Sequence, residues 1–371
     1  MKKKLLIIGG GFAGIKLCKE LHEEFDIILV DENKYHIDQI QIHRYLSSKI
    51  DLEEFTFSFD KFAKLKNIKF INEKICKFDF EKKQVFSKNN TYSYDYLVIS
   101  NGAKTFFPKQ IKNIEKHNLD IKVLEKIKEF KKSFYELIED KKNEEDKNNI
   151  VIAGGGLSGV EIAIELAEVI KQREIKNVQV YIIEQVKEIL PNMNIFLQNR
   201  TNKALDDFNV KRIHGSFITS IENNSMILSS KQSISFSLCL FVLGVSGEFI
   251  ENKQSIKANV KNQYIVNDYL QVAGFSDVFC LGDAAQTYDA NNHYSPTCAQ
   301  IALKQAKYLA QNLRNIKNNK KMIKQKISLQ GILIDLGGKN TIGLLLGMKI
   351  SSLFAYYLKR FTSYLHKKDF Y

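Results

Sequence analysis

A glycine-rich turn occurs twice in this chain, each time between a short apolar strand and a helix. The motif GGGFAG at residues 9–14 follows the apolar run 5–8, and GGGLSG at residues 154–159 follows the run 150–153. In such a motif the first glycine permits a tight turn, the second lets a pyrophosphate approach the backbone, and the third lets helix and strand pack closely. One copy alone is compatible with an ordinary tight turn. Two copies in the same context predict two dinucleotide-binding units of α/β class.

Both units continue with a second apolar strand that ends in an acid. Asp31 follows the strand 27–30, and Glu184 follows the strand 178–183. A carboxylate at this position accepts hydrogen bonds from a ribose and repels a 2′-phosphate. Glu184 therefore favours NADH over NADPH as the ligand of the second unit, although Lys187 lies close by in the sequence.

Composition narrows the class of protein further. With 371 residues, of which 44% are hydrophobic, the chain can form two or three domain cores. The net charge of +13 suits an anionic membrane surface or nucleic acid, or reflects a lysine-rich composition. No nucleic-acid-binding signature accompanies the charge, so nucleic acid is the weaker partner. The lysine-rich start leads directly into the first strand, which predicts a protein that stays in the cytoplasm.

The five cysteines lack the spacing of metal ligands or of a redox pair. They occur at positions 18, 76, 239, 280 and 298, and we interpret them as small buried hydrophobic residues. We therefore expect neither a metal site nor a dithiol relay.

Further strands and a long helix separate and follow the two motifs. Alternating patterns predict strands at 67–71, 74–80, 84–87 and 92–100, a charged helix over 120–140, a solvated linker over 141–149, and more strands between 210 and 244. Near residue 280 an apolar strand ends in Gly282 and Asp283. The Asp283 carboxylate could bind the ribityl chain or phosphates of a flavin, or it could cap the next helix.

Taken in order, the two glycine motifs, the strand ending at Gly102 and the Gly282-Asp283 pair resemble FAD-dependent pyridine-nucleotide oxidoreductases. Segments 31–36 and 295–300 and the end of the chain are similar to type II NADH dehydrogenases. The resemblance implies two Rossmann-like domains and a C-terminal amphipathic segment that docks on a membrane. The implied boundaries are an FAD-binding domain at 1–117 and 262–330, an NADH-binding domain at 118–261, and the docking region at 331–371.

The resemblance also implies the residues of the sites. For FAD they are Gly9, Gly11, Phe12, Ala13, Gly14, Asp31, Lys34, Gly102, Gly282 and Asp283. For NADH they are Gly154, Gly156, Gly159 and Glu184, with Gly244 near the nicotinamide; Ala299 and Gln300 are implied beside a quinone. The family often has a second glutamine four residues after Gln300, where this chain has Lys304, followed by Gln305.

Glu161 is the second residue implied in catalysis, along with Gln300. It follows the second glycine motif and shares a helix face with Glu165. The resemblance implies a proton relay to quinone, and the alternative is stabilisation of the helix dipole by an acid in the first turn.

The end of the chain predicts an amphipathic helix. Leu346, Ile350, Leu353, Tyr357, Phe361 and Tyr364 recur every three or four residues, with lysines and serines between them. Such a helix, with cationic residues near its end, is typical of one that lies in an anionic membrane interface. The alternative is packing on the protein's own core or in a homodimer, and the oligomeric state stays open.

These features together predict a single-subunit NADH:quinone oxidoreductase without proton pumping, on the cytoplasmic face of the cell membrane. The alternatives are a sulfide:quinone oxidoreductase, a soluble NADH:acceptor reductase and a nucleotide-binding redox sensor. The first would need paired reactive cysteines and the second would not need the C-terminal stripe.

Overall fold

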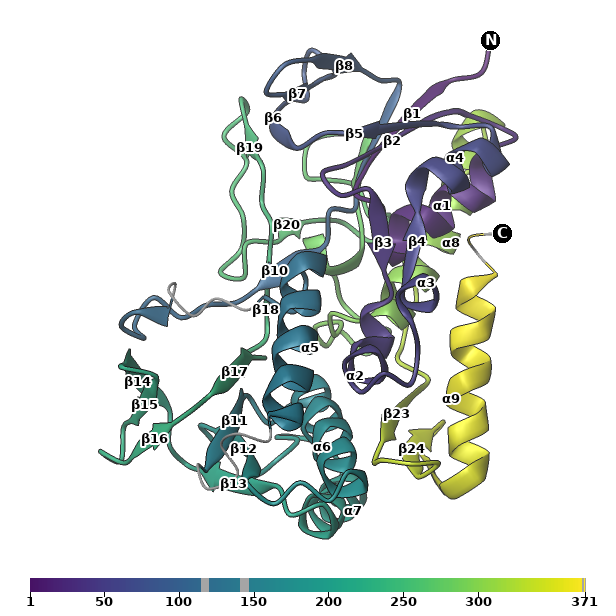
Figure 1. The fold of residues 1–371 in the computed structure, drawn as a ribbon. Coiled ribbons are helices and arrows are strands. Elements are labelled where there is room, and N and C mark those ends of the chain that lie inside the picture. The colour runs from purple at the N-terminus through teal and green to yellow at the C-terminus, as the bar shows by residue number, and fades with distance from the viewer. Residues whose placement is uncertain (115–119, 141–146, 369, 371) are drawn as a thin grey trace.

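The computed structural model describes residues 1–114, 120–140, 147–368 and 370. The boundary predicted at 117 and most of the linker predicted at 141–149 fall outside these residues. Figure 1 shows two α/β units, with the N-terminal unit above the second one and a C-terminal helix along the outer side of both.

The first unit is built on a five-stranded parallel sheet. Its strands, in spatial order, are β21 (Val278–Cys280), β9 (Tyr96–Ile99), β1 (Lys4–Ile8), β2 (Asp26–Asp31) and β5 (Lys69–Asn72). Both faces of the sheet are covered, so the strands are apolar throughout rather than alternating. Helices α1 (Phe12–Leu21) and α8 (Ala299–Lys317) pack against Leu5 and Ile7, while the small sheet that contains β6 (Ile75–Asp79) packs against Leu6 and Ile8. Strands from the first hundred residues and a strand at residues 278–280 thus form one sheet.

The second unit repeats this plan on four parallel strands. The order is β13 (Lys211–His214), β12 (Val178–Glu184), β11 (Asn148–Ala153) and β17 (Leu238–Phe241). Helices α5 (Leu124–Glu139), α6 (Leu157–Gln172) and α7 (Ile195–Asp207) share one core with this sheet. The antiparallel strands β14 (Ile218–Glu222), β15 (Ser225–Leu228) and β16 (Ser233–Ser235) cover its other face.

The chain crosses between the units in two antiparallel strands, β10 (Ala103–Thr105) and β18 (Val245–Gly247). Beyond this crossing, β19 (Glu251–Asn252) pairs with β6, so the chain rejoins the first unit before the boundary predicted at 261. The remaining elements are β3 (Tyr35–Ile37), α2 (Ile42–Leu46), α3 (Leu52–Phe55), β4 (Thr56–Ser58), α4 (Phe59–Lys66), β7 (Gln84–Ser87), β8 (Thr91–Ser93), β20 (Tyr264–Ile265) and β22 (Ala285–Gln286), with short 3₁₀ turns at Gln39–Gln41 and Gly282–Ala284.

Two details of the sequence prediction were wrong in this part of the chain. The strand predicted over 92–100 is two strands, because β8 pairs with β7 while β9 joins the large sheet. Cys76 is exposed on β6 rather than buried, whereas Cys18, Cys239 and Cys280 are buried and Cys298 is half-buried. All five cysteines are free thiols.

The C-terminal region begins as a small sheet and ends as a helix. Strands β23 (Gly331–Asp335), β24 (Thr341–Leu345) and β25 (Met348–Ser351) form an antiparallel meander before α9 (Ser352–Lys367). The prediction that Leu346 and Ile350 lie on the amphipathic helix was wrong, since Leu346 and Gly347 take positive φ angles in the turn between β24 and β25. Among the described residues, no helix is sufficiently long and apolar to cross a membrane.

Candidate functional site

The two glycine turns have the same local geometry. A Cβ added to Gly14 would lie 2.0 Å from the carbonyl oxygen of Gly9, and one added to Gly159 would lie 2.0 Å from that of Gly154. A Cβ on Gly11 would meet nothing nearer than 4.0 Å, and one on Gly156 nothing within 4 Å. The outer glycines are therefore required by packing. The middle glycine of each turn leaves an open surface at a helix N-terminus, where a phosphate can be bound.

The acid at the end of the second strand is tied to the glycine turn in both units. Asp31 Oδ2 accepts from Gly10 N at 2.7 Å, and Glu184 Oε2 accepts from Gly155 N at 2.8 Å. The other carboxylate oxygen accepts from a backbone N–H two residues on, at Asn33 and at Val186. Burial raises the pKa of Asp31, which its hydrogen bonds partly offset. Both carboxylates are thus held in place beside the glycine turn of their own unit.

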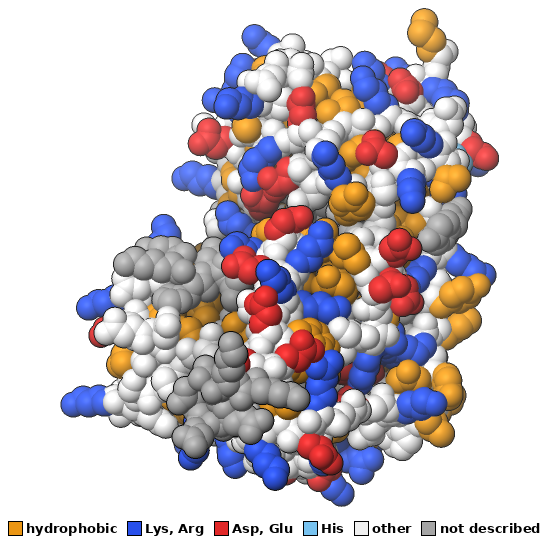
Figure 2. Space-filling view, viewed as in Figure 1, with side chains coloured by type: hydrophobic (Ala, Val, Ile, Leu, Met, Phe, Trp, Pro, Cys, Tyr) orange, Lys and Arg blue, Asp and Glu red, His pale blue; other side chains and the backbone are white. Residues whose placement is uncertain are grey.

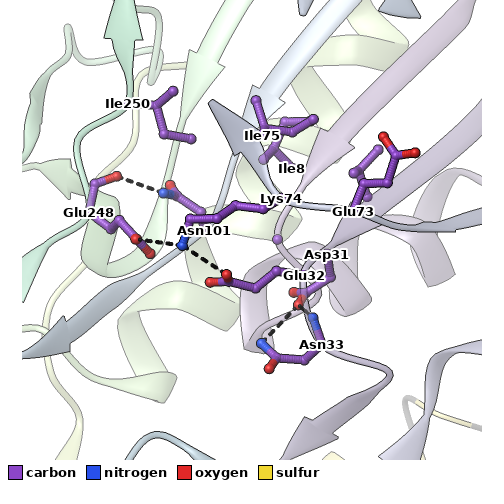
Figure 3. Close-up of a pocket in the computed structure, with 12 residues that line it drawn as sticks. Ile8, Asp31, Glu32, Asn33, Glu73, Lys74, Ile75, Asn101, Glu248 and Ile250 are labelled. Atoms are coloured by element: carbon purple, nitrogen blue, oxygen red, sulfur yellow. Dashed lines mark hydrogen bonds and ion pairs between the residues drawn. The ribbon is translucent and has the colours of Figure 1, made fainter. Parts of the chain in front are cut away.

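A pocket opens between the first glycine turn and the segment that returns from the second unit (Figure 3). At its mouth Lys74 Nζ lies 2.8 Å from Glu32 Oε2 and 3.5 Å from Glu248 Oε1. Asn101 Nδ2 donates to the Glu248 carbonyl oxygen at 2.7 Å. Asp31 and Gly9 also line this pocket, so it adjoins the first glycine turn and is polar.

Gly282 and Asp283 form a short turn at the end of β21, facing the N-terminus of α1. Gln305 on α8 supports this turn, since its Oε1 accepts from Gly282 N at 2.7 Å and its Nε2 donates to Thr287 at 2.9 Å. The N-cap of this turn is Leu281 and the N-cap of the next helix, α8, is Cys298, so Asp283 is at neither capping position. Burial raises the pKa of Asp283, and Lys122 opposes that shift.

The other residues predicted to bind cofactors lie at the crossing between the units, at the starts of α1 and α8, and in the exposed segment before β3. Gly102 and Gly244 have positive φ angles and open space at their Cβ positions, on either side of the crossing between the units. Phe12 starts α1 and packs on His36 and His366. Ala13 lies against Gly282, Ala299 is the first residue of α8, and the Lys34 side chain is exposed.

Glu161 lies in a buried cluster of charged groups that joins four elements. It pairs with Lys359 of α9, and its Oε1 also accepts from Asp335 N at 2.8 Å. His43 of α2 lies between the two acids, with Nε2 2.9 Å from Asp335 Oδ2 and Nδ1 3.7 Å from Glu161 Oε2. Lys359, His43 and Arg360 hold the pKa of Asp335 far below its usual range, against the effect of burial.

This cluster rules out the simpler interpretation of Glu161. The first turn of α6 contains no acid, so Glu161 is not there to stabilise the helix dipole. Glu165, one turn along, is engaged separately, since it accepts from Ser47 Oγ at 2.7 Å and pairs with Lys49.

The side chain of Gln300, which is predicted to contact a quinone, already makes a hydrogen bond within the protein. Its Oε1 accepts from Gln330 N at 2.6 Å, and Lys304 one turn later donates to the Ser328 carbonyl oxygen at 2.9 Å. These two side chains hold segment 328–330 against α8, just before β23. Gln300 therefore lies where the first unit passes into the C-terminal region.

Several residues of the site were missed in the sequence. Ser100 donates to Ile8 and Gly9 carbonyl oxygens and so holds the first glycine turn. His43, Asp335 and Lys359 were not recognised, because they follow no motif and their contacts with one another and with Glu161 span 24 to 292 residues of sequence. The one available signal was that these polar residues interrupt apolar segments.

Two parallel-sheet units, each with an open glycine turn and an acid tied to that turn, define a protein that binds two dinucleotides. The family model of pyridine nucleotide-disulphide oxidoreductases matches residues 3–306, and the chain belongs to this family. A type II NADH:quinone oxidoreductase of Staphylococcus haemolyticus is 26% identical, with 97% of this chain and 94% of the relative covered. The Staphylococcus aureus protein of the same name is 23% identical over the same shares of both chains.

Solved structures show the same fold. NDH2 of Plasmodium falciparum, solved in complex with NADH, superposes with a TM-score of 0.88 at 18% identity and covers 100% of this chain and 98% of its own. The sulfide:quinone oxidoreductase of Aquifex aeolicus superposes with a TM-score of 0.83 at 19% identity, covering 98% and 90%.

Proposed function

We propose that this protein is an FAD-dependent NADH:quinone oxidoreductase of the type II kind, which pumps no protons and works at a membrane surface. The observation that carries the proposal is the pair of glycine turns, each open at its middle glycine and each tied to an acid. The names of the Staphylococcus relatives and the complex of the Plasmodium protein with NADH support it.

The residues fit FAD in the first unit and NADH in the second. Gly11 and the N-terminus of α1 would face the FAD pyrophosphate, Asp31 the adenosine ribose, and Asp283 the ribityl chain. Gly156 and the N-terminus of α6 would face the NADH pyrophosphate, and Glu184 the adenosine ribose. When bound, the flavin accepts hydride from NADH and passes two electrons to quinone. The chain's own part is to align both ligands between Gly102 and Gly244 and to exclude water.

Gln300 and Glu161 are proposed to serve the quinone step. Gln300 lies in the first turn of α8, whose N-terminus faces the Asp283 turn. Its amide can therefore bind a quinone oxygen once it releases the backbone N–H of Gln330. Glu161 is held between Lys359 and His43, and both can transfer protons to and from a carboxylate.

The C-terminal helix supports a location on the membrane surface. Three of its polar side chains, those of Lys359, Ser363 and His366, are buried. Six of its large apolar and aromatic side chains are about half or more exposed: Leu353, Phe354, Tyr357, Phe361, Tyr364 and Leu365. Figure 2 shows hydrophobic side chains gathered on the side where α9 lies. A helix whose apolar face points away from its own protein suits insertion into a lipid interface.

The docking surface is tested by flotation with liposomes that contain anionic lipid. Replacing Tyr357 and Phe361 with aspartate should shift the protein from the liposome fraction to the soluble fraction while flavin stays bound. The control is Leu65→Asp, an exposed apolar side chain on α4 of the first unit. Flotation of the α9 double variant at the level of the unmodified protein would end the proposal of docking through α9.

The activity is tested with purified protein and FAD. We expect a yellow protein that NADH bleaches and that oxidises NADH steadily with a short-chain quinone as acceptor. Turnover with sulfide as donor would favour a sulfide:quinone oxidoreductase, although the five free cysteines offer no disulfide for that chemistry. Bound FAD with no turnover would favour a redox sensor.

A further inference from the structure

A lysine of the second unit reaches the acid of the first. Lys122 Nζ lies 3.9 Å from Asp283 Oδ2, and the two side chains are only 24% and 22% exposed. Burial raises the pKa of the Asp283 carboxyl, and among the described residues Lys122 is the charged group that opposes this shift. This is therefore a partly desolvated contact between the units rather than a solvent-exposed ion pair.

The backbone that carries Lys122 is fixed at the crossing between the units. Asp120 Oδ1 accepts from Lys122 N at 2.8 Å and from Thr105 Oγ1 on β10 at 2.5 Å. Asp120 also forms a backbone bridge with Phe241 at the end of β17, and its carbonyl oxygen accepts from Val123 N. The turn at 120–123 is thus attached to both β10 and the second sheet, which directs Lys122 toward the Asp283 turn.

The neighbouring lysines behave differently. Lys126 pairs with Glu129 at 2.8 Å and Lys128 with Glu125 at 3.7 Å, each with an exposed acid on the same helix. Of the described lysines at positions 122, 126 and 128, Lys122 is the one that contacts an acid of the other unit.

We propose that Lys122 is a positioning residue for FAD, which acts by keeping the Asp283 carboxylate charged and aimed at the ribityl hydroxyls. An ionised carboxylate only accepts hydrogen bonds, which suits hydroxyl donors, whereas a protonated one would compete with them as a donor. The lysine also offsets the repulsion between Asp283 and the FAD pyrophosphate, since both lie at the N-terminus of α1. The inference rests on the proposed role of Asp283.

The test is the dissociation constant of FAD for the apoprotein, measured by quenching of flavin fluorescence. Lys122→Met should raise this constant at least about tenfold, and Lys122→Arg should restore most of the affinity. Lys126→Met, four residues further along the chain on α5, should leave it unchanged. In an Asp283→Asn background, Lys122→Met should have little further effect, because the lysine acts through the acid.

Each result decides a separate point. Loss of affinity in Asp283→Asn with full affinity in Lys122→Met would overturn the inference and leave the role of Asp283 intact. Full affinity in Asp283→Asn would overturn the role of Asp283 itself. An equal loss from Lys122→Met in both backgrounds would show that the lysine does not act through Asp283. If circular dichroism shows that Lys122→Met does not fold, Lys122→Gln replaces it, and unchanged affinity in that variant overturns the inference.

Discussion

Replacing Lys359 with methionine would remove the cation between Glu161 and Asp335 while keeping most of the side-chain volume. The Lys359 side chain is 6% exposed and those of Glu161 and Asp335 are 11% and 7% exposed, so neither acid can turn to water. Breaking a buried ion pair costs roughly 3–5 kcal/mol. Because Arg360 and His43 still contact Asp335, we expect the loss in free energy of unfolding to lie at the lower end of this range, about 3 kcal/mol. Most of this loss arises because Glu161 stays buried without its lysine partner.

The assay is urea denaturation of the flavin-loaded protein. The midpoints of the variants are compared, provided that the free energy of unfolding depends on urea concentration with the same slope in each. Lys367→Met is the matched control on the same helix, since Lys367 pairs with the exposed Glu54, and it should cost less than about 1 kcal/mol. The double variant Glu161→Gln with Lys359→Met should recover a large part of the loss, because it buries no unpaired charge. A midpoint for Lys359→Met equal to that of the control, or no recovery in the double variant, would refute this reasoning.

Four further outcomes follow from the geometry. Gly11→Ala should fold normally but bind FAD weakly, whereas Gly14→Ala should lose thermal stability, because only the second added Cβ meets backbone at 2.0 Å; equal melting temperatures would contradict this. Glu184→Ala should raise the use of NADPH relative to NADH about tenfold or more, while the exposed Glu188→Ala should not, as measured by kcat/KM for each nucleotide. Gln300→Ala should slow reduction of quinone more than reduction of a soluble dye, and equal losses would remove Gln300 from the quinone site. Burial, and secondarily His366, lowers the pKa of His36 to about 3. In the folded protein the His36 imidazole is therefore neutral. Its contribution to the free energy of unfolding is full above about pH 6.5 and is about 2 kcal/mol smaller at pH 5. His36→Asn should flatten this decline in urea midpoints, and an unchanged pH dependence would contradict the assignment.

Much of the cofactor-binding framework follows from short-range pattern. The spacing of Gly9, Gly11 and Gly14 before an apolar helix, and the acid at position 31, are local requirements of one turn and one strand pair. The same holds for Gly154 to Glu184. In each copy the glycines and the acid lie within about thirty residues of one another, so the unit can be predicted from the local sequence without the rest of the fold.

The buried charge cluster could not be predicted from local sequence patterns. His43, Glu161, Asp335 and Lys359 come from α2, α6, β23 and α9, and each has an ordinary local context. Lys359 is one of the lysines between the apolar positions of the predicted amphipathic helix. Its burial could not be predicted, because its charge is compensated by acids that tertiary packing brings to it.

The sequence by itself determined that this chain forms two dinucleotide-binding units and that its end carries an apolar stripe beside a polar one. Both properties depend on residue type at fixed local spacing, which is all that a linear pattern can encode. Only the tertiary structure decided which stripe of α9 faces the protein, how Lys122 meets Asp283, and where Leu346 and Ile350 leave the helix. These outcomes depend on distant partners, since a buried charge is tolerated only where the folded chain supplies its counter-charge.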